Sequence, residues 1–136
     1  MNKTKGFTII ELIVVVAIIA VLASIVAINV TTYLKKGKDA AIKENLSTLQ
    51  TAGVAYLEGT PAGTAACSDV TVLAAMTQLG AITTVANTDC ASAAGVFAAC
   101  AQMIVTTGDY WCADSTGNKK QVTGTCSASW NLTACP

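Results

Sequence analysis

The side chains that could take part in chemistry are few in this chain. One carboxylate, Glu11, lies inside an otherwise apolar stretch, and six cysteines follow downstream. The 136 residues include no histidine, which removes the commonest general base and metal ligand, and also the base of any Ser–His or Cys–His pair. We therefore expect the chain not to be an enzyme and to hold no cofactor and no metal.

Charged residues are scarce and balanced. Eight basic residues offset eight Asp and Glu, and only 12% of residues are charged whereas 53% are hydrophobic. A general nucleic-acid-binding protein needs an excess of positive charge to displace counterions from phosphates. Lys119 and Lys120, close in sequence to Tyr110 and Trp111, could touch DNA, but two neighbouring lysines usually lie only on the surface. We therefore expect no nucleic-acid partner.

Glu11 is the most informative residue of the apolar stretch. Between residues 7 and 30 only Thr8, Glu11, Ser24 and Asn29 interrupt a run of apolar side chains. A charged group at the centre of a membrane costs roughly 2.5–3.5 kcal/mol on insertion scales, so such a carboxylate is usually functional and has a cationic partner. The alternative is an inert carboxylate at headgroup depth.

The six cysteines favour disulfides over a metal site. None forms a C-x-x-C pair and no histidine is present, which gives a zinc site or a thioredoxin-type redox motif little support. A disulfide contributes about 2–4 kcal/mol to a small domain and forms outside the cytoplasm. The sequence cannot choose the pairing, and we predict the sequential one: Cys67–Cys90, Cys100–Cys112 and Cys126–Cys135.

One alternative register would exclude the middle bridge of that set. Gly108 and Asp109 form a turn signal, and a strict two-residue turn there would place Cys112 opposite Val105. Cys100 would then lie about 17 Å from Cys112 along the strand, from the rise per residue, which is too far for a disulfide.

Two weaker sites are possible in the second half of the chain. Asp109, Asp114 and Ser115 could supply oxygen ligands to calcium, but a solvated hairpin turn is the favoured interpretation. Asn131 begins a glycosylation sequon, a three-residue pattern that is too common to carry much weight.

The apolar stretch predicts a membrane-spanning helix over residues 7–34. At 1.5 Å per residue it measures about 42 Å, enough to cross a hydrocarbon core of about 30 Å with tilt. The alternative is a secretory signal peptide cleaved before Ser24. It is disfavoured because the apolar core is longer than is usual for such peptides and carries Glu11 near its start.

The segment before this helix resembles the leader of type IV pilins and pseudopilins. It is short and basic, and the resemblance rests on Lys5-Gly6-Phe7-Thr8-Ile9-Ile10-Glu11-Leu12 and the apolar run that follows. The resemblance implies cleavage between Gly6 and Phe7 by a prepilin peptidase, and N-methylation of Phe7. It also implies that Glu11 pairs with the N-terminal amine of a neighbouring subunit during filament assembly.

The helix is expected to continue over residues 35–58 as an amphipathic half. Its apolar positions follow a spacing of four and three residues, at Ile42, Leu46, Leu49, Gly53 and Tyr56, whereas Lys43, Glu44, Asn45 and Gln50 occupy other faces. Gly59 and Pro61 end the pattern. Many bacterial pilins carry a proline in the region corresponding to residues 25–30. This chain has none there, which favours a more regular helix.

We predict that residues 59–136 form a small head that is cross-linked by disulfides. Ser68 and Asp69 cap a short helix whose apolar positions are Val70, Leu73, Met76 and Leu79. Strands are predicted over residues 99–106, 110–113 and 119–122; beyond Thr123 we expect coil held at most by Trp130 and the last cysteines. The fold class is α+β: a long N-terminal helix packed on a small antiparallel sheet.

These observations predict a structural subunit of a type IV pilus that polymerises through its N-terminal helix. The alternatives are a pseudopilin or minor pilin of a type II secretion or DNA-uptake machine, or a membrane-tethered binding module. The expected partners are copies of itself, the prepilin peptidase and methyltransferase, the pilus assembly platform and the inner membrane. We expect a single-pass precursor after its leader at residues 1–6, with the head outside the cytoplasm, and then an extracellular filament.

Overall fold

The computed structural model describes residues 6–59, 65–83, 87–126 and 134–136, and the chain divides into two units between Leu34 and Lys35. One helix, α1 (Ile9–Gly59), begins in the first unit and ends in the second. Its end at Gly59 confirms the predicted stop before Pro61. It also runs without a break through residues 25–30, where the sequence has no proline.

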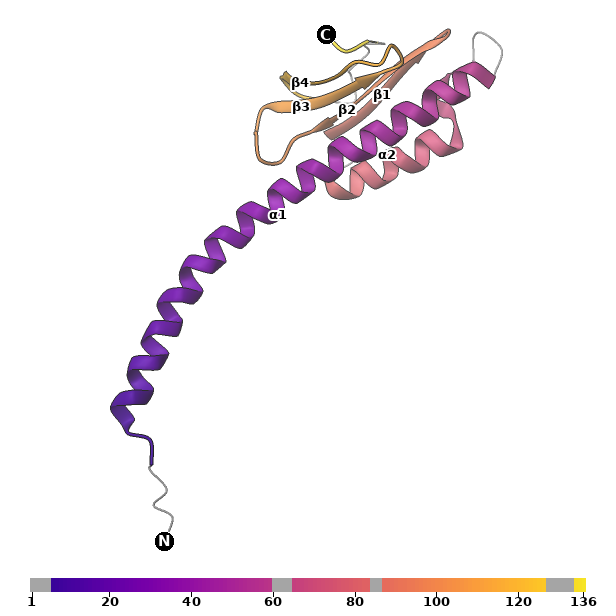
Figure 1. The fold of residues 1–136 in the computed structure, drawn as a ribbon. Coiled ribbons are helices and arrows are strands. Elements are labelled where there is room, and N and C mark those ends of the chain that lie inside the picture. The colour runs from indigo at the N-terminus through magenta and orange to yellow at the C-terminus, as the bar shows by residue number, and fades with distance from the viewer. Residues whose placement is uncertain (1–5, 60–64, 84–86, 127–133) are drawn as a thin grey trace. The chain divides into compact units, whose positions relative to one another are not determined.

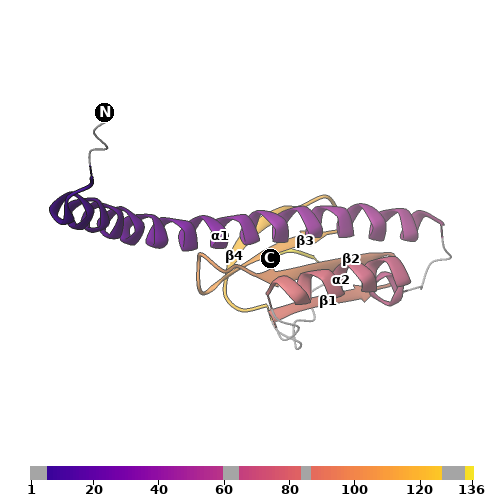
Figure 2. The same cartoon turned by 90° about the horizontal axis from the view of Figure 1, so that it is seen from below.

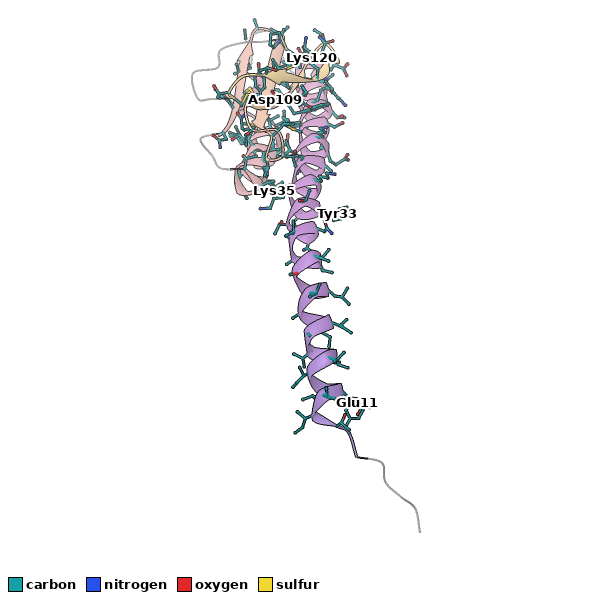
Figure 3. All side chains as sticks on the ribbon, turned by 90° about the vertical axis from the view of Figure 1, so that its left-hand side faces the viewer. Glu11, Tyr33, Lys35, Asp109 and Lys120 are labelled. Atoms are coloured by element: carbon teal, nitrogen blue, oxygen red, sulfur yellow. A yellow bond between two sulfur atoms is a disulfide. The ribbon has the colours of Figure 1, made fainter. Side chains whose placement is uncertain are left out.

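The first unit, in the part that the structure describes, is an apolar helix whose side chains are exposed. Every described residue up to residue 38 is exposed, including large apolar side chains such as Ile9, Ile28 and Leu34. Figure 3 shows side chains projecting from both sides of this part of the helix. An 18-residue window of α1 has a mean hydropathy of 3.2, and none of it is buried. Such a surface marks contact with lipid or with other protein chains.

The second unit is a four-stranded antiparallel sheet packed on helices (Figure 1), which confirms the α+β class. Its strands are joined in chain order and paired in the same order, as β1 (Thr88–Ala93), β2 (Val96–Gln102), β3 (Asp109–Asp114) and β4 (Lys119–Thr123). A short 3-10 helix, η1 (Ala66–Ser68), and a second helix, α2 (Val70–Ile82), precede the sheet.

The second-unit part of α1 and α2 lie side by side on one face of the sheet (Figures 1 and 2). The predicted apolar stripe of α1 is confirmed, because Ile42, Leu46 and Leu49 are fully buried. They pack with α2 and with the side chains that the central strands turn toward the helices, which are Phe97, Ala99, Ala101 and Ala113. Three of these four are alanines, so the helix can approach the sheet closely.

On the opposite face of the sheet, the described residues that follow β4 contribute two buried cysteines. Cys100, Tyr110 and Cys112 form a second buried cluster there with Cys126 and Cys135 from the end of the chain. Since both faces of β2 and β3 are covered, these two strands hold most of the sheet's buried side chains.

The predicted strand over residues 99–106 is wrong at both ends. β2 begins at Val96 and ends at Gln102, and pairing stops because the backbone N–H groups beyond Met103 are used elsewhere. Those of Ile104 and Val105 donate to the carboxylate of Asp39 on α1, over 2.7 and 3.1 Å. β1 was not predicted, because its sequence, TDCASA, shows no alternation of apolar and polar residues. An edge strand that is only half-buried does not need such an alternation.

Helix α2 has the predicted cap but a different buried face. The Asp69 side chain accepts hydrogen bonds from the N–H groups of Thr71 and Val72, as expected of an N-cap. Val70 and Leu73 are 75% and 50% exposed, whereas Val72 is fully buried. The apolar positions chosen from the sequence therefore describe the buried face only in part.

Candidate functional site

The predicted cleavage junction lies in non-helical, exposed backbone at the start of the described chain. Gly6, Phe7 and Thr8 precede the first helical residue, Ile9, and all three are exposed. A Cβ atom on Gly6 would meet no heavy atom within 4 Å. The backbone around the Gly6–Phe7 bond is therefore free for an enzyme to approach, as proteolytic sites generally are.

Glu11 accepts hydrogen bonds from Thr8, the residue directly before the first helical residue. The N–H and the hydroxyl group of Thr8 donate to Glu11 Oε2 over 2.9 and 2.7 Å, and the Glu11 N–H donates to Thr8 Oγ1 over 3.3 Å. The first intrahelical bond follows, from the Leu12 N–H to the Thr8 carbonyl, at 3.3 Å. Figure 3 places Glu11 in this first turn.

These reciprocal bonds form a capping box, in which a Thr and a Glu three residues later satisfy each other's backbone N–H groups. The first N–H groups of a helix have no partner inside the helix, and leaving them unpaired in an apolar medium is costly. Glu11 therefore has a structural role within its own chain, which we did not predict. The Thr-x-x-Glu spacing of Thr8 and Glu11 was the signal available in the sequence.

All six cysteines form disulfides in the structure, but only one predicted pair is correct. Cys67–Cys90 is present as predicted. The other two predicted bridges are wrong, because the observed pairs are Cys100–Cys126 and Cys112–Cys135.

The register of the central strands leaves the predicted Cys100–Cys112 bridge possible and does not by itself select the observed pairing. Cys100 and Cys112 lie directly opposite each other on β2 and β3, because the connection over residues 103–108 is longer than the two-residue turn that would have placed Cys112 opposite Val105. Cys126 and Cys135, which follow β4 in the chain, lie on this face of the sheet, and each is joined to one of the two strands by a disulfide.

Two polar side chains, one half-buried and one fully buried, accept hydrogen bonds from the backbone of these two cysteines. Gln102 accepts from the Cys126 N–H over 3.1 Å, and Asp114 accepts from the Cys135 N–H over 2.9 Å. Each C-terminal cysteine is thus fixed both by a disulfide and by a hydrogen bond to its own backbone. The expectation that the last cysteines hold the end of the chain is confirmed; Trp130 and the sequon at Asn131 lie outside the described residues.

Asp114 is the most heavily bonded carboxylate of the second unit. Its two oxygens accept from the backbone and side chains of Thr116 and Asn118 and from the Cys135 N–H. Burial raises the pKa of Asp114, but these hydrogen bonds outweigh it and lower the pKa to about 2. The Asp114 oxygens that we considered as calcium ligands therefore accept hydrogen bonds from the β3–β4 turn and from Cys135.

The other polar candidates also make contacts within the chain. Lys119 Nζ donates to Ser47 Oγ on α1 over 2.7 Å, and Lys43 Nζ lies 4.5 Å from the centre of the Trp111 ring. Lys120 is exposed on β4, an edge strand, where a lysine discourages pairing with a further strand. Among the described residues, no three His, Cys, Asp or Glu side chains cluster as a metal site would require.

The comparisons with known proteins concern the start of the chain. A family model described as the prokaryotic N-terminal methylation motif matches residues 1–27. This match includes the Gly6–Phe7 junction, the Thr8–Glu11 capping box and much of the apolar helix. Neither the curated proteins nor the solved structures gave a match to the chain. Residues 1–27 therefore carry the N-terminal leader and methylation motif of the type IV pilins and pseudopilins.

Proposed function

We propose that this chain is the structural subunit of a type IV pilus and polymerises through the part of α1 that lies in the first unit, before Lys35. The observation that carries the proposal is the combination of a methylation motif with a wholly exposed apolar helix. In the precursor the membrane covers this helix, and in the filament other copies of the same helix replace the lipid. In this role the chain acts as a building block and not as an enzyme.

The maturation step of the proposal starts at the leader. A prepilin peptidase cuts between Gly6 and Phe7, and the new amino group of Phe7 is methylated. The exposed, non-helical backbone at this junction supports the proposal, because a protease needs such a segment. The three disulfides support a head, residues 59–136, that lies outside the cytoplasm.

The assembly step pairs Glu11 with the amine of Phe7 on a neighbouring subunit. Both charges enter a core of apolar helices, where their attraction is stronger than in water and an unmatched charge is costly. A subunit that docks out of register leaves both charges unpaired. Glu11 thus contributes to the register of the filament as well as to its stability.

Pseudopilins and minor pilins of secretion or DNA-uptake machines would share this helix, and a membrane-tethered binding module would share the anchor. The head favours a coat subunit over a binding module. Among the described residues of the head, the only large apolar side chains that are exposed are Val70, Leu73 and Val105. Patches that bind partners are usually larger and contiguous.

The test is to measure the amount of subunit in filaments sheared from the cell surface. We expect the chain to be the most abundant protein of that fraction, to appear as filaments by electron microscopy and to begin at Phe7 by mass spectrometry. A trace amount in filaments made of another protein would identify a minor pilin, and retention in the cell envelope would identify a pseudopilin. A mature chain that begins at Ser24 would overturn the whole assignment.

A further inference from the structure

Four of the six cysteines form one buried cluster on the sheet, in which two disulfides lie next to each other. β2 and β3 contribute one cysteine each, and the other two follow β4 in the chain; the four are Cys100, Cys112, Cys126 and Cys135. Each observed bridge joins a strand to a residue beyond β4, as Cys100–Cys126 and Cys112–Cys135. The two strand cysteines lie directly opposite each other, although they are not bonded to each other.

The backbone hydrogen bonds of β2 and β3 define the spacing of this opposed pair. The Met103 N–H donates to the Asp109 carbonyl over 2.9 Å, and this bonded pair lies three positions along the chain from Cys100 and Cys112. Because bonded and non-bonded pairs alternate along antiparallel strands, Cys100 and Cys112 form a non-hydrogen-bonded pair, whose Cα atoms lie about 4.5 Å apart. A disulfide between them is therefore sterically possible without movement of the strands.

The four cysteines differ in how far solvent reaches them. Cys135 is 9% exposed and Cys126 is 2% exposed, whereas Cys100 and Cys112 are fully buried. A thiolate opens a disulfide by attacking one sulfur, and the other sulfur leaves as a thiolate. A reductant that approaches from solvent and attacks at Cys135 therefore releases Cys112, which lies opposite Cys100.

We propose that this cluster is a redox-sensitive switch, in which one reduction at Cys135 opens both bridges to the end of the chain. A thiolate of a dithiol reductant attacks Cys135 Sγ, and Cys112 leaves as a thiolate. Cys112 Sγ then attacks Cys100 Sγ, forming a Cys100–Cys112 disulfide, and Cys126 leaves. The second thiol of the reductant closes the reductant's own disulfide and releases Cys135.

The reductant supplies two electrons, and its two thiol protons end on Cys126 and Cys135. β2 and β3 remain joined, now by their own bridge, while the two cysteines beyond β4 lose their covalent attachment to the sheet. The alternative is that the two bridges are independent and that each needs its own reduction. This inference concerns the sheet alone and does not depend on filament assembly.

Partial reduction of the full chain in detergent with dithiothreitol separates the two alternatives. Free thiols are alkylated after an acid quench, and chymotrypsin, which cuts after Phe97, Tyr110 and Trp130, then places the four cysteines on separate peptides. Among molecules with two free thiols in the cluster, we expect alkylation at Cys126 and Cys135 together with a Cys100–Cys112 peptide.

Two other products would overturn the proposal. If most of these molecules carry alkylated Cys112 and Cys135 and keep Cys100–Cys126, the bridges are independent and Cys112 does not attack its neighbour. If most carry alkylated Cys100 and Cys126 and keep Cys112–Cys135, the reduction does not begin at Cys135.

A matched pair of variants tests the internal attack by its rate. Cys112→Ala/Cys135→Ala removes the attacking thiolate, so Cys100–Cys126 should open at least roughly tenfold more slowly than in the wild type, since a well-oriented internal group has a very high effective concentration. Cys67→Ala/Cys90→Ala also removes one bridge but leaves the cluster intact, and its Cys100–Cys126 bridge should open at the wild-type rate. Equal opening in Cys112→Ala/Cys135→Ala and the wild type would overturn the proposal. If circular dichroism shows that a variant does not fold, the wild-type peptides alone decide.

Discussion

The ring of Phe97 on β2 lies against the backbone of Gly53 on α1. A Cβ atom built on Gly53 would come within 2.4 Å of Phe97 Cζ and 2.6 Å of Cε1, closer than real Cβ atoms approach other heavy atoms. Phe97 is fully buried and is the largest such side chain of the head. The absence of a side chain at position 53 is therefore what allows this aromatic ring to fill the space between helix and sheet.

Gly53→Ala should destabilise the head although it introduces a better helix former. The added methyl group overlaps a fully buried ring, and overpacking of this kind costs about 1–3 kcal/mol. Gly37→Ala is the control, because nothing lies within 4 Å of the corresponding Cβ position on the same helix. It should instead stabilise the helix by about 0.5–1 kcal/mol. Thermal unfolding of the full chain in detergent would measure both, and equal effects would contradict the packing described.

The head should lose stability in acid through Asp114. The pKa of this group is lowered from 3.8 to about 2 in the folded state, so its contribution is fully present above pH 4. It is lost as the pH falls toward 2, and it amounts to about 2 kcal/mol. Asp114→Asn should be less stable at neutral pH and should show a smaller further loss between pH 4 and 2. A pH profile parallel to that of the wild type would exclude Asp114 as the source.

Asp39 should stabilise the connection between β2 and β3. Asp39→Ala leaves the N–H groups of Ile104 and Val105 without their acceptor, and loss of a charged acceptor of this kind costs about 1.5–3 kcal/mol. Glu44→Ala on the exposed side of α1 should change stability by less than about 0.5 kcal/mol. Hydrogen exchange at Ile104 and Val105 should accelerate in Asp39→Ala alone. Unchanged exchange there would mean that the carboxylate does not hold the loop.

The disulfide pairing can be read directly from the mature protein. Alkylation without a reductant should label no cysteine, and peptides of the unreduced protein should link Cys100 to Cys126 and Cys112 to Cys135. Reduction should release the C-terminal segment from the sheet and lower stability by several kcal/mol, since each bridge contributes about 2–4 kcal/mol. A Cys100–Cys112 peptide would contradict the structure.

The sequence predicted well the features that depend on local patterns. The end of α1 follows from Gly59 and Pro61, its buried stripe from the spacing of Ile42, Leu46 and Leu49, and the start of α2 from Asp69. Each of these depends on residues only a few positions apart, so the pattern and the structure agree. The Thr8–Glu11 capping box is equally local and could have been found in the same way.

Features that depend on distant segments could not be predicted in this way. Cys100 and Cys112 bond to Cys126 and Cys135, and the spacing of cysteines along a sequence does not determine which of them pair. Gln50 was placed on a polar face, yet it is only 6% exposed and its side-chain amide donates to the Asp114 carbonyl. The end of β2 likewise depends on Asp39, which lies far away in sequence.

The role of Glu11 tests the account most directly. Glu11→Ala removes the partner of the Phe7 amine but leaves the leader, the cleavage junction and most of the apolar helix intact, so the precursor should still insert and be cleaved. The amine would then enter an apolar filament core without its counter-charge, at a cost of several kcal/mol.

The decisive measurement is the yield of filaments from cells in which Glu11→Ala is the only copy, compared with the amount of processed subunit in their membranes. We predict normal levels of subunit that begins at Phe7 and few or no filaments, whereas Thr31→Val should assemble normally. Abundant filaments built from Glu11→Ala alone would show that this carboxylate only caps its own helix, and would contradict its role in assembly.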